Sequence, residues 1–209
     1  MDQKSYEELI DAANEARVAT DDAKAIDLYR QAISIGGPRD NEARWMLGVS
    51  LINNGDFEAA LQELNTVLED CDDSDKPNVL RDRARAMGKL KRFNESQQDI
   101  ADSLKQLEAS NNKSEYGATL GFGARLKVDQ GDAQGALADF AKADKILKST
   151  DNRHYELYNK MHYAEALVNS GNKVKASKAL DEAENLIPQY GGEKHSKRAQ
   201  ELREKLSQA

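Results

Sequence analysis

The segment Gly55–Leu64, GDFEAALQEL, sets a pattern that the chain repeats. Gly55 can adopt a positive φ and so end one helix, and Asp56 can cap the next by accepting a bond from a free backbone N–H, as Asp132 and Asn172 can in two later copies. Further copies begin at Thr20, Lys91, Gly131 and Gly171, so the spacings are 35, 36, 40 and 40 residues. Each copy therefore predicts a tight turn between two helices.

Small residues recur at two fixed places around each turn. In the helix after the turn, a small residue precedes a larger one by four positions, so both share one helical face. The small residues of these second helices are Ala25, Ala60, Ser96, Ala136 and Ala176. Those of the first helices are Ala13, Gly48, Ala84, Ala124 and Ala164. An ordinary helical bundle does not require both sets in register, so we predict an array of closely crossing helix pairs.

Apolar periodicity and capping residues place the helices. Ser5 with Glu8 forms a capping box, Ser114 is suited to cap a later helix, and Pro188 is expected to end another. A narrow apolar stripe at Leu202 and Leu206 predicts a last helix that covers the end of the array. The predicted helices span residues 5–18, 22–35, 41–53, 56–70, 77–90, 93–109, 114–130, 133–148, 152–170, 173–187 and 193–207.

The charge is unevenly spread along the chain. The sequence has 209 residues, a net charge of −7 and a mean hydropathy of −0.80. Residues 1–75 carry 18 acidic and 6 basic side chains, whereas residues 76–209 carry 19 and 24. An acidic chain without a long basic stripe argues against nucleic acid as a partner.

The sequence favours a cytoplasmic location without a membrane partner. Cys71 is the only cysteine, which excludes an intrachain disulfide and fits a reducing compartment. No apolar run reaches the roughly 18 residues of a membrane span. The first residues, MDQKS, lack the basic and apolar regions of a signal peptide.

Signals for catalysis and metal binding are weak. The acidic run 69–75 would suit calcium, but an EF-hand counted from Asp70 needs Gly and Glu where the chain has Asp75 and Arg81. His162 and Glu165 are three residues apart and lack a third ligand. No phosphate-binding glycine loop and no Ser/His/Asp arrangement is present. We therefore predict no catalytic residue, no metal, no cofactor and no enzymatic activity.

The repeat resembles the tetratricopeptide family over nearly the whole chain. The residues that carry the resemblance are Leu47-Gly48, Gly55-Asp56-Phe57 and Ala60 in one unit, and Ala164, Gly171, Ala176 and Pro188 in another. Trp45, one position later than the family's usual aromatic, and Lys91-Arg92 in place of Gly-Asp depart from the family pattern.

The resemblance implies an all-α fold, a right-handed α-solenoid of about five helix-turn-helix repeats with a C-terminal capping helix. It implies one domain over residues 1–209. The expected units cover about 5–38, 40–75, 77–112, 114–150 and 152–190, followed by the capping helix 193–207.

In this family the first helices of the pairs line a concave groove. The carboxylate clamp that some members use is not carried over, because Ile10 and Met46 replace its Lys and Asn. Positions beside the small residues give a predicted peptide-binding groove with an apolar section, a basic middle and a further apolar end. Its residues are Trp45, Met46, Val49, Arg81, Arg85, Gly121, Phe122, Arg125 and Met161.

These residues predict a non-catalytic adaptor or scaffold that binds a protein or peptide segment, acidic and with an apolar anchor. Three neighbouring arginines repel one another, and a ligand carboxylate would relieve the repulsion through bidentate bonds. The rival interpretation is that Arg85 or Arg125 pairs internally with Asp82, Asp129 or Glu165. The alternative function is a self-associating structural or regulatory module, a homo-oligomer that packs its groove or edge against a second copy.

Overall fold

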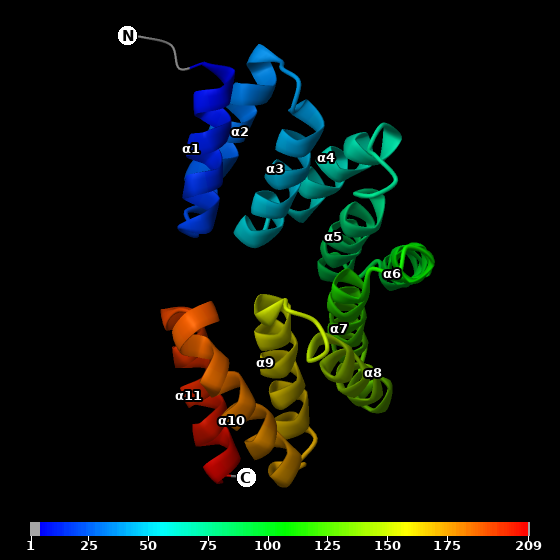
Figure 1. The fold of residues 1–209 in the computed structure, drawn as a ribbon, viewed down its shortest axis with the longest axis vertical. Helices are drawn as coiled ribbons and strands as arrows, with labels where there is room; N and C mark the ends of the chain where they lie inside the picture. The colour runs from blue at the N-terminus through cyan, green and yellow to red at the C-terminus, as the bar shows by residue number, and fades with distance from the viewer. Residues whose placement is uncertain (1–4, 209) are drawn as a thin grey trace. The chain divides into compact units, whose positions relative to one another are not determined.

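The computed structural model describes residues 5–208, which form eleven α-helices and no strand (Figure 1). The all-α prediction is confirmed, and every predicted helix is found within a few residues of its expected bounds. No helix in this range is both long and apolar enough to cross a membrane. The helices are α1 (Tyr6–Val18), α2 (Asp22–Ile35), α3 (Asp40–Asn54), α4 (Phe57–Glu69), α5 (Lys76–Lys89), α6 (Phe93–Ala109), α7 (Lys113–Asp129), α8 (Ala133–Leu147), α9 (Arg153–Asn169), α10 (Lys173–Tyr190) and α11 (Glu193–Gln208).

The predicted turn residues share one backbone conformation. Their φ angles are 59° at Thr20, 96° at Gly55, 60° at Lys91, 85° at Gly131 and 73° at Gly171, all in the left-handed region. Glycine adopts this region without steric cost, whereas threonine and lysine lose roughly 1–2 kcal/mol there. The two copies that lack glycine therefore keep the turn geometry of the others, as the repeat predicts.

Two predicted caps are present. The Ser5 N–H donates to Glu8 Oε2 at 2.8 Å, and the Glu8 N–H donates to Ser5 Oγ at 3.3 Å, which completes the capping box. Asp132 Oδ1 accepts from the Gly135 N–H at 2.9 Å and caps α8. These bonds fix where α1 and α8 begin.

Three other predicted cap bonds are absent. Asn112, and not Ser114, caps α7 by accepting from the Glu115 N–H at 3.2 Å. Asp56 makes no side-chain cap bond, and its carboxylate accepts from the Asn54 side chain at 2.6 Å. Asn172 also makes no side-chain cap bond.

Pro188 does not end α10, which continues to Tyr190. A proline removes one N–H and crowds the preceding turn, but it stands close to the helix end here. The Gly191 N–H still donates to the Ile187 carbonyl at 2.9 Å, so the helix can close beyond the proline.

Both sets of small residues are buried, as predicted. The second-helix residues Ala25, Ala60, Ser96, Ala136 and Ala176 and the first-helix residues Ala13, Ala84, Ala124 and Ala164 all have 0% exposure. At Gly48, an added Cβ would lie 2.9 Å from Leu64 Cδ2. The repeat therefore keeps these positions small because neighbouring helices cross there.

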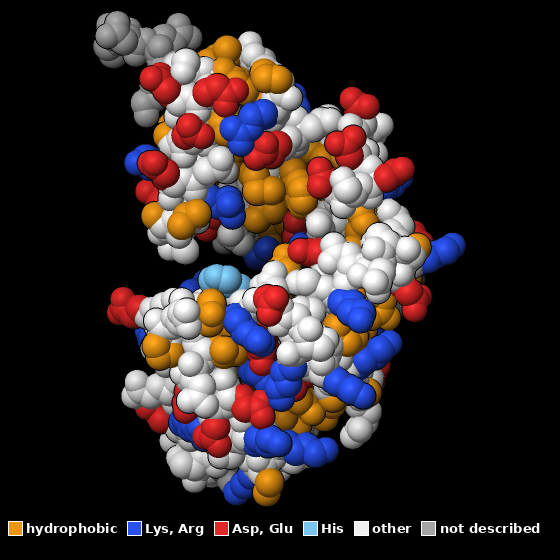
Figure 2. Space-filling model, viewed as in Figure 1, with side chains coloured by type: hydrophobic (Ala, Val, Ile, Leu, Met, Phe, Trp, Pro, Cys, Tyr) orange, Lys and Arg blue, Asp and Glu red, His pale blue; other side chains and the backbone are white. Residues whose placement is uncertain are grey.

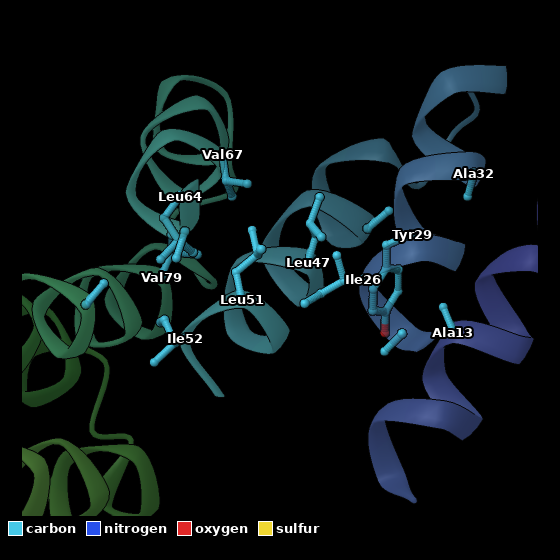
Figure 3. Packing of buried hydrophobic residues seen from close by; sticks show 14 of the residues in the cluster. Ala13, Ile26, Tyr29, Ala32, Leu47, Leu51, Ile52, Leu64, Val67 and Val79 are labelled. Atoms are coloured by element: carbon cyan, nitrogen blue, oxygen red, sulfur yellow. The ribbon is translucent and has the colours of Figure 1, made fainter. Parts of the chain in front are cut away.

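The chain divides into two compact units, unit 1 ending at Asp102 and unit 2 beginning at Ser103, with the boundary inside α6. In unit 1, Tyr29, Leu47, Leu51 and Leu64 contribute to a continuous apolar core (Figure 3). The hydroxyl of the buried Tyr29 donates to Asn14 Oδ1 at 2.6 Å, so the core holds no unpaired phenol there. The expected single domain over 1–209 stays a prediction.

The last helix covers α9 and α10 in unit 2, as predicted. Ala199 and Leu202 of α11 belong to the unit's main core, at 3% and 0% exposure, and Leu206 packs against its edge. Arg203 Nε also donates to Glu184 Oε1 of α10 at 3.0 Å. The apolar stripe thus meets the core while the charged residues stay at its rim.

Candidate functional site

The first-helix face of unit 1 combines apolar and charged side chains. We define it by the half-buried Trp45, Met46 and Val49 of α3 with the buried Asp82 and the half-buried Arg85 of α5. Hydrophobic side chains are visible over α3 in Figure 2. The Trp45 Nε1–H donates to Asp82 Oδ2 at 2.9 Å. This bond fixes the indole and satisfies its polar edge, which leaves the ring to make apolar contacts.

The two predicted arginines of α5 differ. Arg81 is buried, with 6% exposure, and has interaction partners of its own. Arg85 is half-buried, and its Nη2 donates to Asn53 Oδ1 at 2.6 Å. No described carboxylate forms an ion pair with Arg85, and Asp82, three residues before it, accepts from Trp45. Arg85 therefore carries a positive charge that its contacts do not neutralise.

Two residues near Arg85 belong to this face but were not predicted from the sequence. Asn53 joins three elements, since its Nδ2 donates to Asp22 Oδ1 of α2 at 3.1 Å while its Oδ1 accepts from Arg85. Lys89 is exposed and follows Arg85 by one helical turn, which adds a second positive charge. The i, i+4 spacing from Arg85 could have indicated that Lys89 lies on the same helical face. Only the fold shows that Asn53, at the end of α3, reaches Arg85.

Arg125, on α7 of unit 2, is held internally. Its Nη1 lies 2.7 Å from His162 Nδ1 and 3.7 Å from Glu165 Oε2, both on α9. Its Nε lies 3.5 Å from Asp129 Oδ1. At Arg125 the structure therefore has the internal ion pairs of the rival interpretation.

An aromatic row lies next to Arg125. The ring centroids of Phe122 and Tyr158 are 4.7 Å apart, and those of Tyr158 and His162 are 4.4 Å apart. Such spacings are typical of favourable ring pairs. Tyr158 was missed from the sequence, although it precedes His162 by one helical turn.

Gly121 and Met161 lie in packed surroundings. Met161 is 5% exposed and belongs to the core around Leu157. Gly121 is buried, and a Cβ added to it would lie 2.7 Å from Asn159 Oδ1. Of the predicted groove residues of unit 2, only Phe122 and Arg125 keep half-buried side chains.

We expect Gly121→Ala to lower the free energy of unfolding by about 1–3 kcal/mol, because the added methyl overpacks the contact with Asn159. The Asn159 side chain is held by a bond from its Nδ2 to the Phe140 carbonyl at 3.2 Å. Urea denaturation measures the loss. In an Asn159→Ala background the added methyl meets no Oδ1, so the second loss should be smaller. Strictly additive losses would contradict this packing role.

The charges around Arg125 shift two pKa values. The His162 ring, Arg198 and Arg125 outweigh burial and lower the pKa of the Glu165 carboxyl to about 2. Burial lowers the pKa of His162, opposed by Glu165 and reinforced by Arg125. Glu165 is therefore charged and His162 is neutral near pH 7. No group of three metal-ligating side chains occurs among the described residues.

No protein-family model and no curated protein matches the sequence. Solved structures do match. A Rap protein complexed with competence and sporulation factor is similar with a TM-score of 0.85 at 11% identity, over 93% of this chain and 57% of that one. The chain thus spans little more than half of that protein.

Two further structures extend the likeness. A tetratricopeptide-repeat protein from Thermus thermophilus is similar with a TM-score of 0.72 at 16% identity, over 98% of both chains. Kinesin light chain-like repeats from Podospora anserina are similar with a TM-score of 0.63 at 15% identity, over 88% of this chain and 97% of that one. The chain therefore has the tetratricopeptide-repeat fold.

Proposed function

We propose that the chain is a non-catalytic scaffold whose first-helix face in unit 1 binds an acidic protein or peptide segment with an apolar anchor. The observation that carries the proposal is the half-buried Arg85, which no described carboxylate neutralises, beside the apolar side chains of α3. The chain's fold supports the general role, since repeat arrays present extended binding surfaces. A Rap protein of the same fold was solved with a bound factor.

The contacts on this face suggest which of its residues would bind each part of a ligand. Asp82 and Arg85 are three residues apart on α5, so the Trp45 contact and the arginine lie within one helical turn. A ligand carboxylate can replace the neutral Asn53 amide as the acceptor of Arg85, and a charge-assisted bond is worth about 1.5–3 kcal/mol. An apolar ligand side chain would pack on Trp45 and Met46.

Other parts of the sequence interpretation stay predictions. Arg81 and Arg125 have less to offer a ligand, because the first is buried and the second is paired internally. The absence of nucleic-acid and membrane partners and a cytoplasmic location rest on composition alone.

Self-association is the second candidate, and the uneven charge favours it. Residues 1–75 carry 18 acidic and 6 basic side chains, and the remaining residues carry 19 and 24, so opposite ends of two copies attract. Sedimentation at low and high salt tests this idea. A dimer that forms at low salt and dissociates at high salt would support it, and a monomer under both conditions would contradict it.

Selection from a random peptide library tests the ligand. We expect the selected peptides to place Asp or Glu next to an aromatic or aliphatic residue. Arg85→Ala should weaken a selected peptide about tenfold or more at low salt, because a charged bond is lost. Arg92→Ala removes an exposed arginine that pairs with Glu95 and should change little. Basic selected peptides, or less than about a twofold loss for Arg85→Ala, would contradict the proposal.

A further inference from the structure

The bond between Arg125 and His162 fixes the protonation state of the imidazole. The two nitrogens are 2.7 Å apart, and a guanidinium can only donate. His162 Nδ1 must therefore accept with its lone pair, which places the ring proton on Nε2 and leaves the ring neutral. A protonated His162 would have donors on both nitrogens and could not keep this bond.

A second acceptor stands ready on the same helix. Glu165 Oε2 lies 3.7 Å from His162 Nδ1, too far for a hydrogen bond but close enough to accept one after a small rotation. The Glu165 carboxyl has a pKa of about 2, so it remains charged over the range in which histidine titrates. The side chain of His162 is 23% exposed, so solvent protons can reach it.

The charged groups around His162 come from three helices. Arg125 faces it from α7 and pairs with Asp129, Tyr158 and Glu165 approach it from α9, and Arg198 of α11 pairs with Glu165 and Glu201. This set holds two arginines and three carboxylates while His162 is neutral. A protonated His162 adds one positive charge to this set.

We propose that Arg125, His162 and Glu165 form a proton-operated switch on unit 2, in which protonated His162 bonds to Glu165 and releases Arg125. The proton enters at Nδ1, where it replaces the Arg125 Nη1 donor. The imidazolium then donates to Glu165 Oε2, and the Arg125 Nη1 donor becomes available to an external carboxylate. This last step rests on the proposed function, whereas the exchange of bonds does not.

Imidazole ¹⁵N NMR of the full chain tests the switch directly. Near neutral pH we expect an unprotonated Nδ1 and a protonated Nε2 at His162, with resonances assigned through His154→Gln and His195→Gln. Nδ1 should gain its proton only as the pH falls below the ordinary pKa of histidine, because burial lowers the pKa of His162. A protonated Nδ1 or a charged ring at neutral pH would overturn the switch, and this measurement needs no substitution in the site.

A matched pair of variants tests the role of Arg125. Arg125→Met removes the donor and a positive charge, so the pKa of His162 should rise by about one unit or more. Lys127→Met removes one charge from the same helix, where Lys127 pairs with Asp139 at 2.6 Å, and should leave that pKa unchanged. Equal shifts in the two variants would overturn the proposal.

Binding of a pentaglutamate peptide tests the last step. Its affinity should increase severalfold between neutral pH and about pH 5.5 in the wild type. His162→Gln keeps a neutral acceptor for Arg125 and should abolish the increase. If NMR shows the exchange of bonds at His162 but the affinity does not change, the released arginine does not bind carboxylates and the last step is contradicted. The proposed binding face of unit 1 is not affected by that result. If the exchange is absent, the switch is wrong whatever the peptide does.

Discussion

Replacing Lys160 by methionine is expected to lower the free energy of unfolding by about 3 kcal/mol, because the substitution leaves carboxylates without their buried cation. Lys160 is 2% exposed on α9. Its Nζ lies 2.7 Å from Asp144 Oδ1 of α8, 2.5 Å from Glu182 Oε2 of α10 and 3.5 Å from Glu156 Oε1 of α9. One ammonium therefore joins three helices of unit 2.

The surrounding charges set the size of this effect. Lys148 also binds Asp144 and Glu182, at 3.0 and 2.9 Å, and Arg153 pairs with Glu156 at 2.5 Å. These cations keep the carboxylates partly compensated, so we expect a loss at the lower end of what a broken buried pair costs. Chemical denaturation of both proteins near neutral pH measures it.

Lys148→Met is the matched control. It removes a lysine that bonds to the same two carboxylates but is 43% exposed, so it should cost at most about 1 kcal/mol. Equal losses for the two variants would show that burial of Lys160 does not matter.

Acid gives a second test. Burial raises the pKa of Glu182, but Lys148 and Lys160 outweigh it and lower that pKa to about 2 from 4.5.

A carboxyl whose pKa is lower in the folded than in the unfolded protein stabilises the fold at pH values above its unfolded pKa. This contribution is lost as the pH falls through its folded pKa. In wild type, the contribution of Glu182 is therefore lost between about pH 4.5 and 2. Lys160→Met removes one cation that lowers this pKa, so the difference in stability between the two proteins should shrink over that window. A constant difference would contradict the assigned partners.

The repeat was predictable because its signals are local. Gly55 and Asp56, two adjacent residues, predict a turn. The burial of Ala60 follows from its fixed spacing along the sequence from that turn. Turn geometry at Lys91 could be inferred from register although the residue itself does not favour it. Helix ends were less certain where two polar residues compete, since Asn112 and Ser114 are both suited to cap a helix and only one accepts the bond.

The candidate site was less predictable, because contacts between helices decide which charges remain available. Arg85 and Arg125 occupy matching places in successive repeats, yet Arg85 bonds to a neutral amide and Arg125 to His162 with carboxylates nearby. Gly121 was expected to face a ligand, and the contact that an added Cβ would make with Asn159 of α9 explains this glycine as packing. Spacing along one helix shows neither difference.

Removing α11 by ending the chain after Gly192 is expected to destabilise unit 2 by about 2–5 kcal/mol and to cause concentration-dependent aggregation. Leu202 is fully buried and Ala199 nearly so, and both pack against the core that α9 and α10 form. Without α11, that apolar face meets water, as the open end of a repeat array does. Thermal denaturation and sedimentation of the shortened chain measure both effects.

Two point variants separate the apolar contact from the ion pairs of the same helix. Leu202→Ala should reproduce most of the loss, since truncating a buried leucine costs about 2–5 kcal/mol. Arg203→Ala removes contacts with Asp181 and Glu184 from a side chain that is 32% exposed, and should cost about 1 kcal/mol or less. A shortened chain that stays monomeric and melts at the wild-type temperature would contradict the capping role. Equal losses in the two point variants would instead place the stabilisation in the charged rim.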